Sequence, residues 1–237
     1  MPRLKILFKI TLPIFIILFV CGYAWLFLIK SRTFQFFGTL VDHVDTDQKI
    51  VALTFDDAPG KYTDEILDIL ASKNIPATFY AVGQSMEQHP DQTRRIVAAG
   101  HELGNHSYSH QRLIFRSPTF IKNEIEQTNQ QIRAAGFTGE ITFRPPHGKK
   151  LFFLPWYLYR NNIKTIMWDI EPDTYFAGDA TEITAYTLNN TKPGSIILMH
   201  PFCQTTCAAD RAVLPGIIDG LKKKGYRFVT VGELVRG

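Results

Sequence analysis

The sequence predicts an α/β protein built on a parallel sheet, and three observations support this fold class. Short apolar runs alternate with amphipathic segments about seven times between Lys49 and the C-terminus. The apolar runs are continuous, which is typical of strands that are covered on both faces. Polar residues follow several of the runs, at the strand ends that converge on one face of a parallel sheet. The pattern favours one α/β domain, either a closed barrel or an open sheet.

The expected strands and helices alternate in order along the chain. The expected strands are Val51–Phe55, Ala77–Val82, His101–Gly104, Ile141–Phe143, Thr165–Trp168, Ser195–Met199 and Arg227–Val231. Expected helices begin near Thr63, Pro90 and Ser117, and a later one carries Leu214, Ile217 and Leu221 on its buried face. Gly100 and Gly136 are expected just beyond two helix ends, because glycine readily adopts the left-handed conformation found there.

Composition limits the classes of partner. The chain has 237 residues and a hydrophobic content of 45%, which is ordinary for a globular protein. Its formal net charge is +4, but residues 1–32 contain five basic residues and no acidic one, whereas the other 205 residues contain 21 basic and 22 acidic residues. The near-neutral body argues against nucleic acid as a partner.

Residues 10–29 form an uncharged stretch of 20 residues. This length is sufficient to cross a hydrocarbon core of about 30 Å. Because no small-residue cleavage site follows, the stretch predicts an uncleaved single-pass anchor. Three basic residues precede it and two follow, which favours a cytoplasmic N-terminus and an extracytoplasmic body at the cell membrane. We therefore expect a tail and transmembrane anchor over 1–32, a lead-in over 33–48 and a catalytic domain over 49–237.

The first expected strand stops at two adjacent carboxylates, Asp56 and Asp57. Neighbouring carboxylates at the end of a buried strand repel one another unless a cation or hydrogen-bond donors stabilise them. An Asp-rich turn is the alternative interpretation, since Pro59 and Gly60 are turn residues. A functional site is favoured because later strands also end at polar residues, which are His106, His110, Arg144, Asp169 to Asp173, and His200.

His106 and His110 are separated by three residues, which would place their imidazoles one turn apart if the segment were helical. Two surface histidines at this spacing are the alternative. Together with the carboxylate of Asp57, they would form a two-histidine, one-carboxylate set that leaves coordination positions open for water and substrate. The set predicts one divalent metal ion, with zinc the default and cobalt, nickel or iron as alternatives.

Cys203 and Cys207 are the two cysteines of the body, since Cys21 lies in the expected anchor. Their separation of four residues in an exported domain favours a disulfide over two free thiols. Metal ligation near His200 is the least favoured reading, because no second C-x-x-C pair accompanies them.

Four segments occur in order: Thr54-Phe55-Asp56-Asp57-Ala58-Pro59, His106-Ser107-x-Ser109-His110, Arg144-Pro145-Pro146-x-Gly148 and Leu198-Met199-His200. Together they resemble the motifs of the polysaccharide deacetylases, the chitin-deacetylase-like carbohydrate esterases. The resemblance covers residues from about 49 to 235. It implies a distorted (β/α)7 barrel and metal-dependent removal of N-acetyl groups from the amino sugars of an envelope or chitin-like polysaccharide.

The resemblance also implies a role for each matching residue. The metal ligands would be Asp57, His106 and His110. The acid–base residues would be Asp56 as general base, Arg144 as the residue that orients it, and His200 as general acid. The oxyanion and substrate would meet the backbone N–H of His147, with Pro146 and Trp168 beside it. Amide hydrolysis needs such parts, because the carbonyl is a poor electrophile and the amine a poor leaving group.

The segment Trp168 to Tyr175 departs from the family pattern, which often has an Asp-Trp pair whose Asp tunes the acid histidine. Ungapped counting places Thr174 at that position, whereas a shift of one residue places Asp173 there. We expect Asp173 to tune His200, with Glu171 as the substitute.

Three functions are compatible with the sequence. The first is an amino-sugar N-deacetylase whose partner is an acetylated glycan. The second is a related deacylase that acts on an O-acetylated glycan or a lipid-linked amino sugar. The third is an inactive glycan-binding module, which only the altered segment after Trp168 supports.

Overall fold

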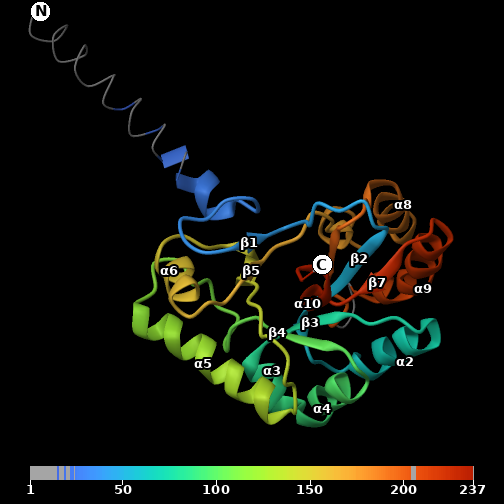
Figure 1. The fold of residues 1–237 in the computed structure, drawn as a ribbon, viewed down its shortest axis with the longest axis horizontal. Helices are drawn as coiled ribbons and strands as arrows, with labels where there is room; N and C mark the ends of the chain where they lie inside the picture. The colour runs from blue at the N-terminus through green and yellow to red at the C-terminus, as the bar shows by residue number, and fades with distance from the viewer. Residues whose placement is uncertain (1–14, 16–18, 20–21, 24, 204–206, 237) are drawn as a thin grey trace, which may run out of the picture.

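The structure is a computed structural model that describes residues 15, 19, 22–23, 25–203 and 207–236 (Figure 1). Among these residues, no helix combines the length and the apolar character needed to cross a bilayer. Eleven of the 20 residues of the predicted anchor over 10–29 lie outside the described residues, so it stays a prediction.

In the described part of the chain, seven parallel strands form the centre of the fold. They are β1 (Leu40–Val41), β2 (Ile50–Ala58), β3 (Thr78–Ala81), β4 (Glu102–Asn105), β5 (Thr165–Ile166), β6 (Ile196–Met199) and β7 (Arg227–Val229). β3 pairs with one edge of β2, and β4 pairs with β3. β6 pairs with the opposite edge of β2, β7 pairs with the start of β2 on the same edge as β3, and β1 pairs with β5. The predicted α/β class with parallel strands is confirmed.

Single-residue bridges connect the two strand groups. Phe143 bridges in parallel to Asn105 on one side and to Thr165 on the other, which links β4 to β5. Ile170, just beyond β5, bridges to Ile197 of β6. The strands thus form an irregular ring that is consistent with the predicted distorted barrel.

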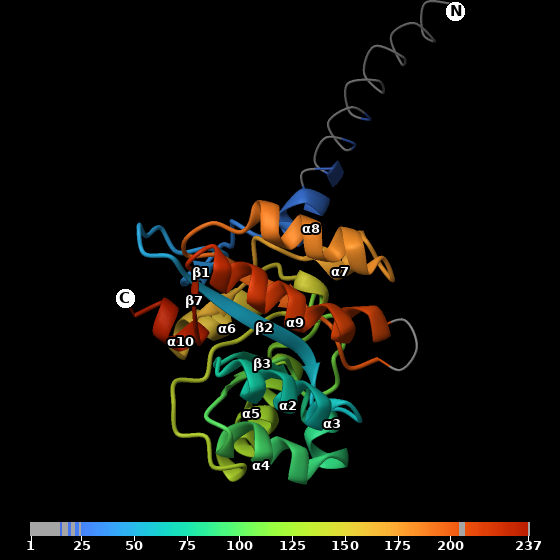
Figure 2. The same cartoon turned by 90° about the vertical axis from the view of Figure 1, so that its right-hand side faces the viewer.

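Helices surround this ring, as Figures 1 and 2 show. They are α2 (Thr63–Lys73), α3 (Gly83–Gln88), α4 (Pro90–Ala98), α5 (Pro118–Ala134), α6 (Phe153–Arg160), α7 (Pro172–Tyr175), α8 (Ala180–Asn190), α9 (Ala208–Lys223) and α10 (Val231–Leu234), with a 3-10 turn at Pro146–Gly148. The predicted start of α5 is confirmed, because the Ser117 hydroxyl accepts a hydrogen bond from the backbone of Phe120 at 3.2 Å.

The two faces of β2 pack into different clusters. Val51, Leu53 and Phe55 belong to the cluster that the sheet forms with α2 and α9, whereas Ile50 and Ala52 belong to a smaller cluster with residues of β5 and β6. Side chains alternate along a strand, so the second face continues with Thr54 and Asp56. Burial on both faces explains the continuous apolar run, and the alternation carries Asp56 into the barrel interior.

Most of the expected strands are shorter than predicted, and two of them lose at least half of their length. The expected strand Ile141–Phe143 is reduced to the bridge at Phe143, and the expected strand Thr165–Trp168 ends at Ile166. Pro145 and Pro146 follow directly after Arg144 and lack the N–H groups that would extend a ladder. β1 and the helices α3, α6, α7, α8 and α10 were not among the elements that we placed from the sequence.

Candidate active site

A groove of about 600 Å³ opens at the carboxyl ends of the strands. Residues that line it include Asp56, Asp57, His106, His110, Trp168 and His200, which the sequence had placed after different strands. The structure therefore brings the predicted site residues together.

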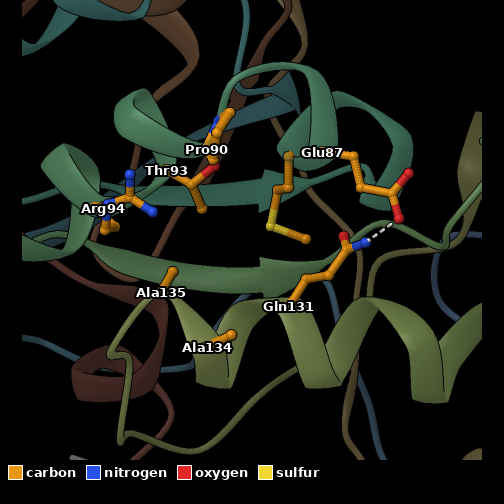
Figure 3. Close-up of a pocket in the computed structure, with 8 residues that line it drawn as sticks. Glu87, Pro90, Thr93, Arg94, Gln131, Ala134 and Ala135 are labelled. Carbon is orange, nitrogen blue, oxygen red and sulfur yellow. Dashed lines mark hydrogen bonds between the residues drawn. The ribbon is translucent and has the colours of Figure 1, made fainter.

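A second, smaller pocket of about 200 Å³ lies between α3, α4 and α5 (Figure 3). Its polar lining includes Glu87, which accepts a hydrogen bond from Gln131 at 2.7 Å. Met86, Pro90 and Ala134 supply apolar surface there. None of the predicted site residues lines this pocket, so the chemistry is assigned to the groove.

Asp56 is the buried acid of the groove, with 2% of its surface exposed. The Arg144 guanidinium donates a hydrogen bond to Asp56 Oδ1 at 2.8 Å. Burial alone would raise the pKa of this carboxyl, but the positive charges of Arg144, His106 and His200 together hold it below its usual value. Asp56 is therefore ionised at neutral pH and able to accept a proton.

Arg144 is fully buried, and its donors are used on several sides. Besides Asp56, it donates to the Thr54 hydroxyl at 2.8 Å and to the carbonyl oxygens of Ile166 and Met167 at 3.3 and 3.1 Å. Its guanidinium lies 4.0 Å from the centre of the Tyr80 ring. These contacts fix the position of the guanidinium, and its hydrogen bond in turn holds the Asp56 carboxylate in one orientation.

Asp57, His106 and His110 each offer a ligand atom, and these atoms lie within 4.8 Å of one another. The Nε2 atom of His110 is 3.2 Å from Asp57 Oδ1, and that of His106 is 3.9 Å from the same oxygen. One carboxylate and two imidazoles at this spacing suit a divalent cation with open positions.

The two histidines are not on a helix, so the interpretation of one helical turn is wrong. Ser107 and His110 both have positive φ values, 66° and 54°. The turn is stabilised by side chains: Asn105 accepts from the Ser107 amide at 2.7 Å, and the Ser107 hydroxyl accepts from the His110 amide at 3.1 Å. Glu124 of α5 adds bonds from the Tyr108 and Ser109 amides. Polar side chains that bond to the backbone thus replace helical geometry.

The protonation states of the histidines fit metal binding. His106 Nδ1 lies 2.7 Å from the Arg144 carbonyl oxygen, which can only accept, so Nδ1 is the donor and Nε2 is the nitrogen that faces Asp56 and Asp57. Burial and then the charge of His106 lower the pKa of His110 to about 4, so its imidazole is neutral at pH 7. The donor set therefore fits the predicted metal ion.

His200 is held by Asp173. Its Nδ1 lies 3.1 Å from Asp173 Oδ2, and its backbone N–H donates to the same oxygen at 2.5 Å. Burial would lower the pKa of His200, but the hydrogen bond and charge of Asp173 raise it to about 9. The imidazolium is the main form at neutral pH, which is the state a general acid requires.

Glu171 does not occupy the position beside His200. Its Oε2 accepts instead from Trp168 Nε1 at 2.8 Å. Thr174 lines the groove but makes no side-chain bond to His200 among the described residues. Of the three residues that the sequence left open, Asp173 is the one that contacts His200.

The loop after Arg144 brings a backbone donor to the groove. His147 has a φ of 57°, and its ring lies 4.7 Å from the ring of His110. Within the described residues, its backbone N–H makes no hydrogen bond. Gly148 has a φ of 64°, and a Cβ there would lie 3.0 Å from the Trp168 ring. The glycine thus allows the backbone directly after the buried Pro146 and His147 to approach the Trp168 ring.

Sequence reasoning missed two residues near His200, Asp210 and Arg211 of α9. Asp210 is 5% exposed, and burial followed by the charge of Asp173 raises its pKa to about 6. Arg211 donates to the carbonyl oxygens of Pro201 and Cys203 at 2.8 and 3.0 Å. Neither residue follows a strand, so the signal that identified the other site residues is absent from both.

The structure joins Cys203 and Cys207 in a disulfide with an S–S distance of 1.95 Å. Cys207 directly precedes α9, so the bond ties the loop after His200 to this helix.

Comparisons with known proteins agree with this geometry. Residues 43–159 match the family Polysaccharide deacetylase. A peptidoglycan-N-acetylglucosamine deacetylase of Bacillus cereus is 36% identical over 186 residues, which cover 78% of this chain and 67% of that protein. The chain belongs to the polysaccharide deacetylase family. The predicted enzyme class is therefore confirmed.

Solved structures of this family are similar along most of the chain. The structure of a peptidoglycan N-acetylglucosamine deacetylase superposes with a TM-score of 0.77 at 32% identity, covering 81% of this chain and 91% of that one. A pseudoenzyme of the same esterase family from Bacillus anthracis superposes with a TM-score of 0.74 at 28% identity, covering 82% of this chain and 68% of that one. Because the family includes a pseudoenzyme, membership alone does not show that a chain is active, and the evidence for activity has to come from its site residues.

The metal ligands generate a first prediction. The purified full-length chain should hold about one divalent ion, and His106→Ala should lose most of it, because a buried imidazole ligand is removed. His89→Ala, which changes a histidine outside the groove, is the matched control and should keep its metal. Elemental analysis of the three proteins checks this. Equal metal content in the His106→Ala protein and the control would contradict the assignment.

The pair of His200 and Asp173 generates a second prediction. The histidine is protonated up to a pKa of about 9 because Asp173 stabilises the imidazolium, so Asp173→Asn should lower that pKa. Because activity needs protonated His200, the alkaline limit of the pH profile should lie at a lower pH in the Asp173→Asn protein than in the unchanged protein. Thr174→Ala is the control and should keep the alkaline limit. The pH profiles of kcat/KM measure this, and coincident profiles would refute the role of Asp173.

Proposed function

We propose that this chain removes N-acetyl groups from the amino sugars of peptidoglycan, with N-acetylglucosamine as the acetylated residue. One observation carries the proposal: an ionised, oriented Asp56 and a protonated His200 line the same groove as three neighbouring metal-ligand side chains. Relatives named as deacetylases of peptidoglycan N-acetylglucosamine support the choice of substrate. The chain covers only 39% of one of these relatives, from Listeria monocytogenes, so it accounts for one part of that longer protein.

The residues divide the reaction into three tasks. Asp56, held by Arg144, takes a proton from a water molecule while the oxygen of that water attacks the carbonyl carbon of the acetamido group. The His147 amide stabilises the negative charge that develops on the carbonyl oxygen. His200 then gives its proton to the nitrogen as the carbon–nitrogen bond breaks, which releases acetate and a free amine.

Asp57, His106 and His110 would hold the metal ion, which we propose is zinc. Two imidazoles and one carboxylate are a ligand set that zinc enzymes commonly use, and zinc has no redox chemistry to interfere with hydrolysis. When bound, the ion would polarise the carbonyl and lower the pKa of water to about 7.

We also propose that residues 10–29 anchor the chain in the cell membrane with the groove outside the cytoplasm. The uncharged length of 20 residues and the flanking basic residues support this arrangement. A reporter enzyme fused after Gly237 should be active only outside the cytoplasm, and the full chain should fractionate with membranes. A cytoplasmic reporter signal, or a mature chain that begins beyond residue 29, would contradict the anchor.

Acetate release from acetylated glycans tests the proposed activity. The full-length chain should release acetate from peptidoglycan, and Asp56→Asn should slow turnover by roughly 10²–10⁴ while metal stays bound, because only the base is removed. Assays of O-acetylated glycans and lipid-linked amino sugars cover the alternative deacylase. If the metal-loaded chain releases no acetate from any of these substrates but binds them, the inactive glycan-binding module is the better description.

A further inference from the structure

One wall of the catalytic groove comes from the segment directly before the lead-in. Ile29 and Ser31 are buried against the body. Lys150 is only 1% exposed, and its side-chain ammonium donates to the carbonyl oxygen of Ser31. The backbone N–H of Lys150 donates to the carbonyl oxygen of Ile29 at 3.3 Å. Lys30 lies between these two fixed residues and lines the groove. Its position is therefore set by the fold.

Arg32 closes the same wall and is already paired. It donates to Glu171 at 2.7 Å and to the Tyr175 hydroxyl at 2.9 Å. Its guanidinium lies 4.9 Å from the centre of the Trp168 ring. Arg32 therefore holds the wall against the site, and its charge is compensated by Glu171.

Three other cations of the groove have no such partner. Lys30, Arg112 and Lys149 all line it, and none of them forms an ion pair with a carboxylate of the described residues. They come from separate parts of the chain but line one groove. Burial and then the charges of Arg112 and Lys30 lower the pKa of Lys149, as expected for neighbouring cations. Lys30 and Arg112 are exposed and Lys149 is half-buried, so water screens their mutual repulsion, and an anion that bound between them would find three free positive charges.

The acidic residues of the groove cannot supply that counter-charge. Asp56 is paired with Arg144, and Glu171 is paired with Arg32. Asp57 lies beside the histidines of the metal-ligand set. A bound divalent ion would add further positive charge. The groove thus has an excess of positive charge beside the reacting centre.

We propose that the groove takes a glycan in which a carboxylate or a phosphate lies next to the N-acetylglucosamine residue that is deacetylated, and that Lys30, Arg112 and Lys149 bind this anionic group. This inference rests on the proposed deacetylase function and narrows its substrate. It makes the three cations specificity-determining residues, while Asp56 and His200 perform the chemistry.

Substrate competition tests the proposal with the full-length chain. Three short acetylated oligomers serve as substrates: a neutral N-acetylglucosamine oligomer, one that contains N-acetylmuramic acid, and one that ends in N-acetylglucosamine phosphate. Lys30→Ala, Arg112→Ala and Lys149→Ala should each lower the ratio of kcat/KM for an anionic substrate to that for the neutral one by roughly 2–5-fold, mainly through KM. Lys149→Arg should restore most of that ratio.

Lys122→Ala is the matched control, since this exposed lysine on α5 does not line the groove, and it should leave the ratio unchanged. A loss confined to the N-acetylmuramic acid arm identifies the carboxylate, and a loss confined to the phosphate arm identifies the phosphate. Equal losses on all three substrates, or none, would overturn the proposal and leave the cations with a structural role.

A binding measurement separates this inference from the proposed function. Metal-loaded Asp56→Asn should bind an anionic oligomer more tightly than the neutral one in calorimetry, and the preference should fall at high salt. If the anionic oligomer binds more tightly but the unchanged chain releases no acetate, the charge preference stands and only the deacetylase function is refuted. Equal affinity for neutral and anionic oligomers, together with normal turnover, would refute the charge preference alone.

Discussion

The buried pair of Arg144 and Asp56 is the interaction on which the rest of the site depends. A charge inside a barrel is costly unless it is paired and its remaining hydrogen-bond sites are satisfied. Arg144 meets this condition by donating hydrogen bonds to Asp56, to Thr54 and to the carbonyl oxygens of Ile166 and Met167 at β5. The same bonds join β2 to β5 across the interior. The orientation of the base is therefore part of the packing of the barrel.

Opposite electrostatic environments give two neighbouring groups their separate roles. Arg144 keeps Asp56 ionised, whereas Asp173 keeps His200 protonated up to a pKa of about 9. A base and an acid in one groove must have their pKa values pushed in these directions to coexist near neutral pH. Asp173 is itself buried, and Asp210 lies close enough that the charge of Asp173 raises its pKa. The residues that surround the general acid His200 thus come from α7 and α9, whereas the general base Asp56 comes from β2.

The sequence was most informative where polar residues directly follow a strand, because the carboxyl ends of parallel strands converge on one face of the sheet. That rule placed Asp56, Asp57, Arg144 and His200 in one site. It also placed His106 and His110 there, but it gave neither the backbone conformation between them nor the site residues that lie on helices. The turn of His106 to His110 is made by side-chain bonds from Asn105 and Glu124, and no local periodicity encodes it. Asp210 sits on a helix whose amphipathic pattern gives no reason to single it out.

The segment before the lead-in shows most clearly why hydropathy and structure divide the chain differently. Hydropathy assigns Ile29 to an apolar stretch, since only the polarity of successive residues is considered. In the structure, Ile29 is buried against the body, and Arg32 is paired with Glu171 beside Trp168. If residues 10–29 are the proposed anchor, almost no linker separates the membrane surface from the groove. Substrate would then have to reach Lys30 and the reacting centre close to the bilayer, so the anchor and the charged wall would act together in selecting which glycans are accepted.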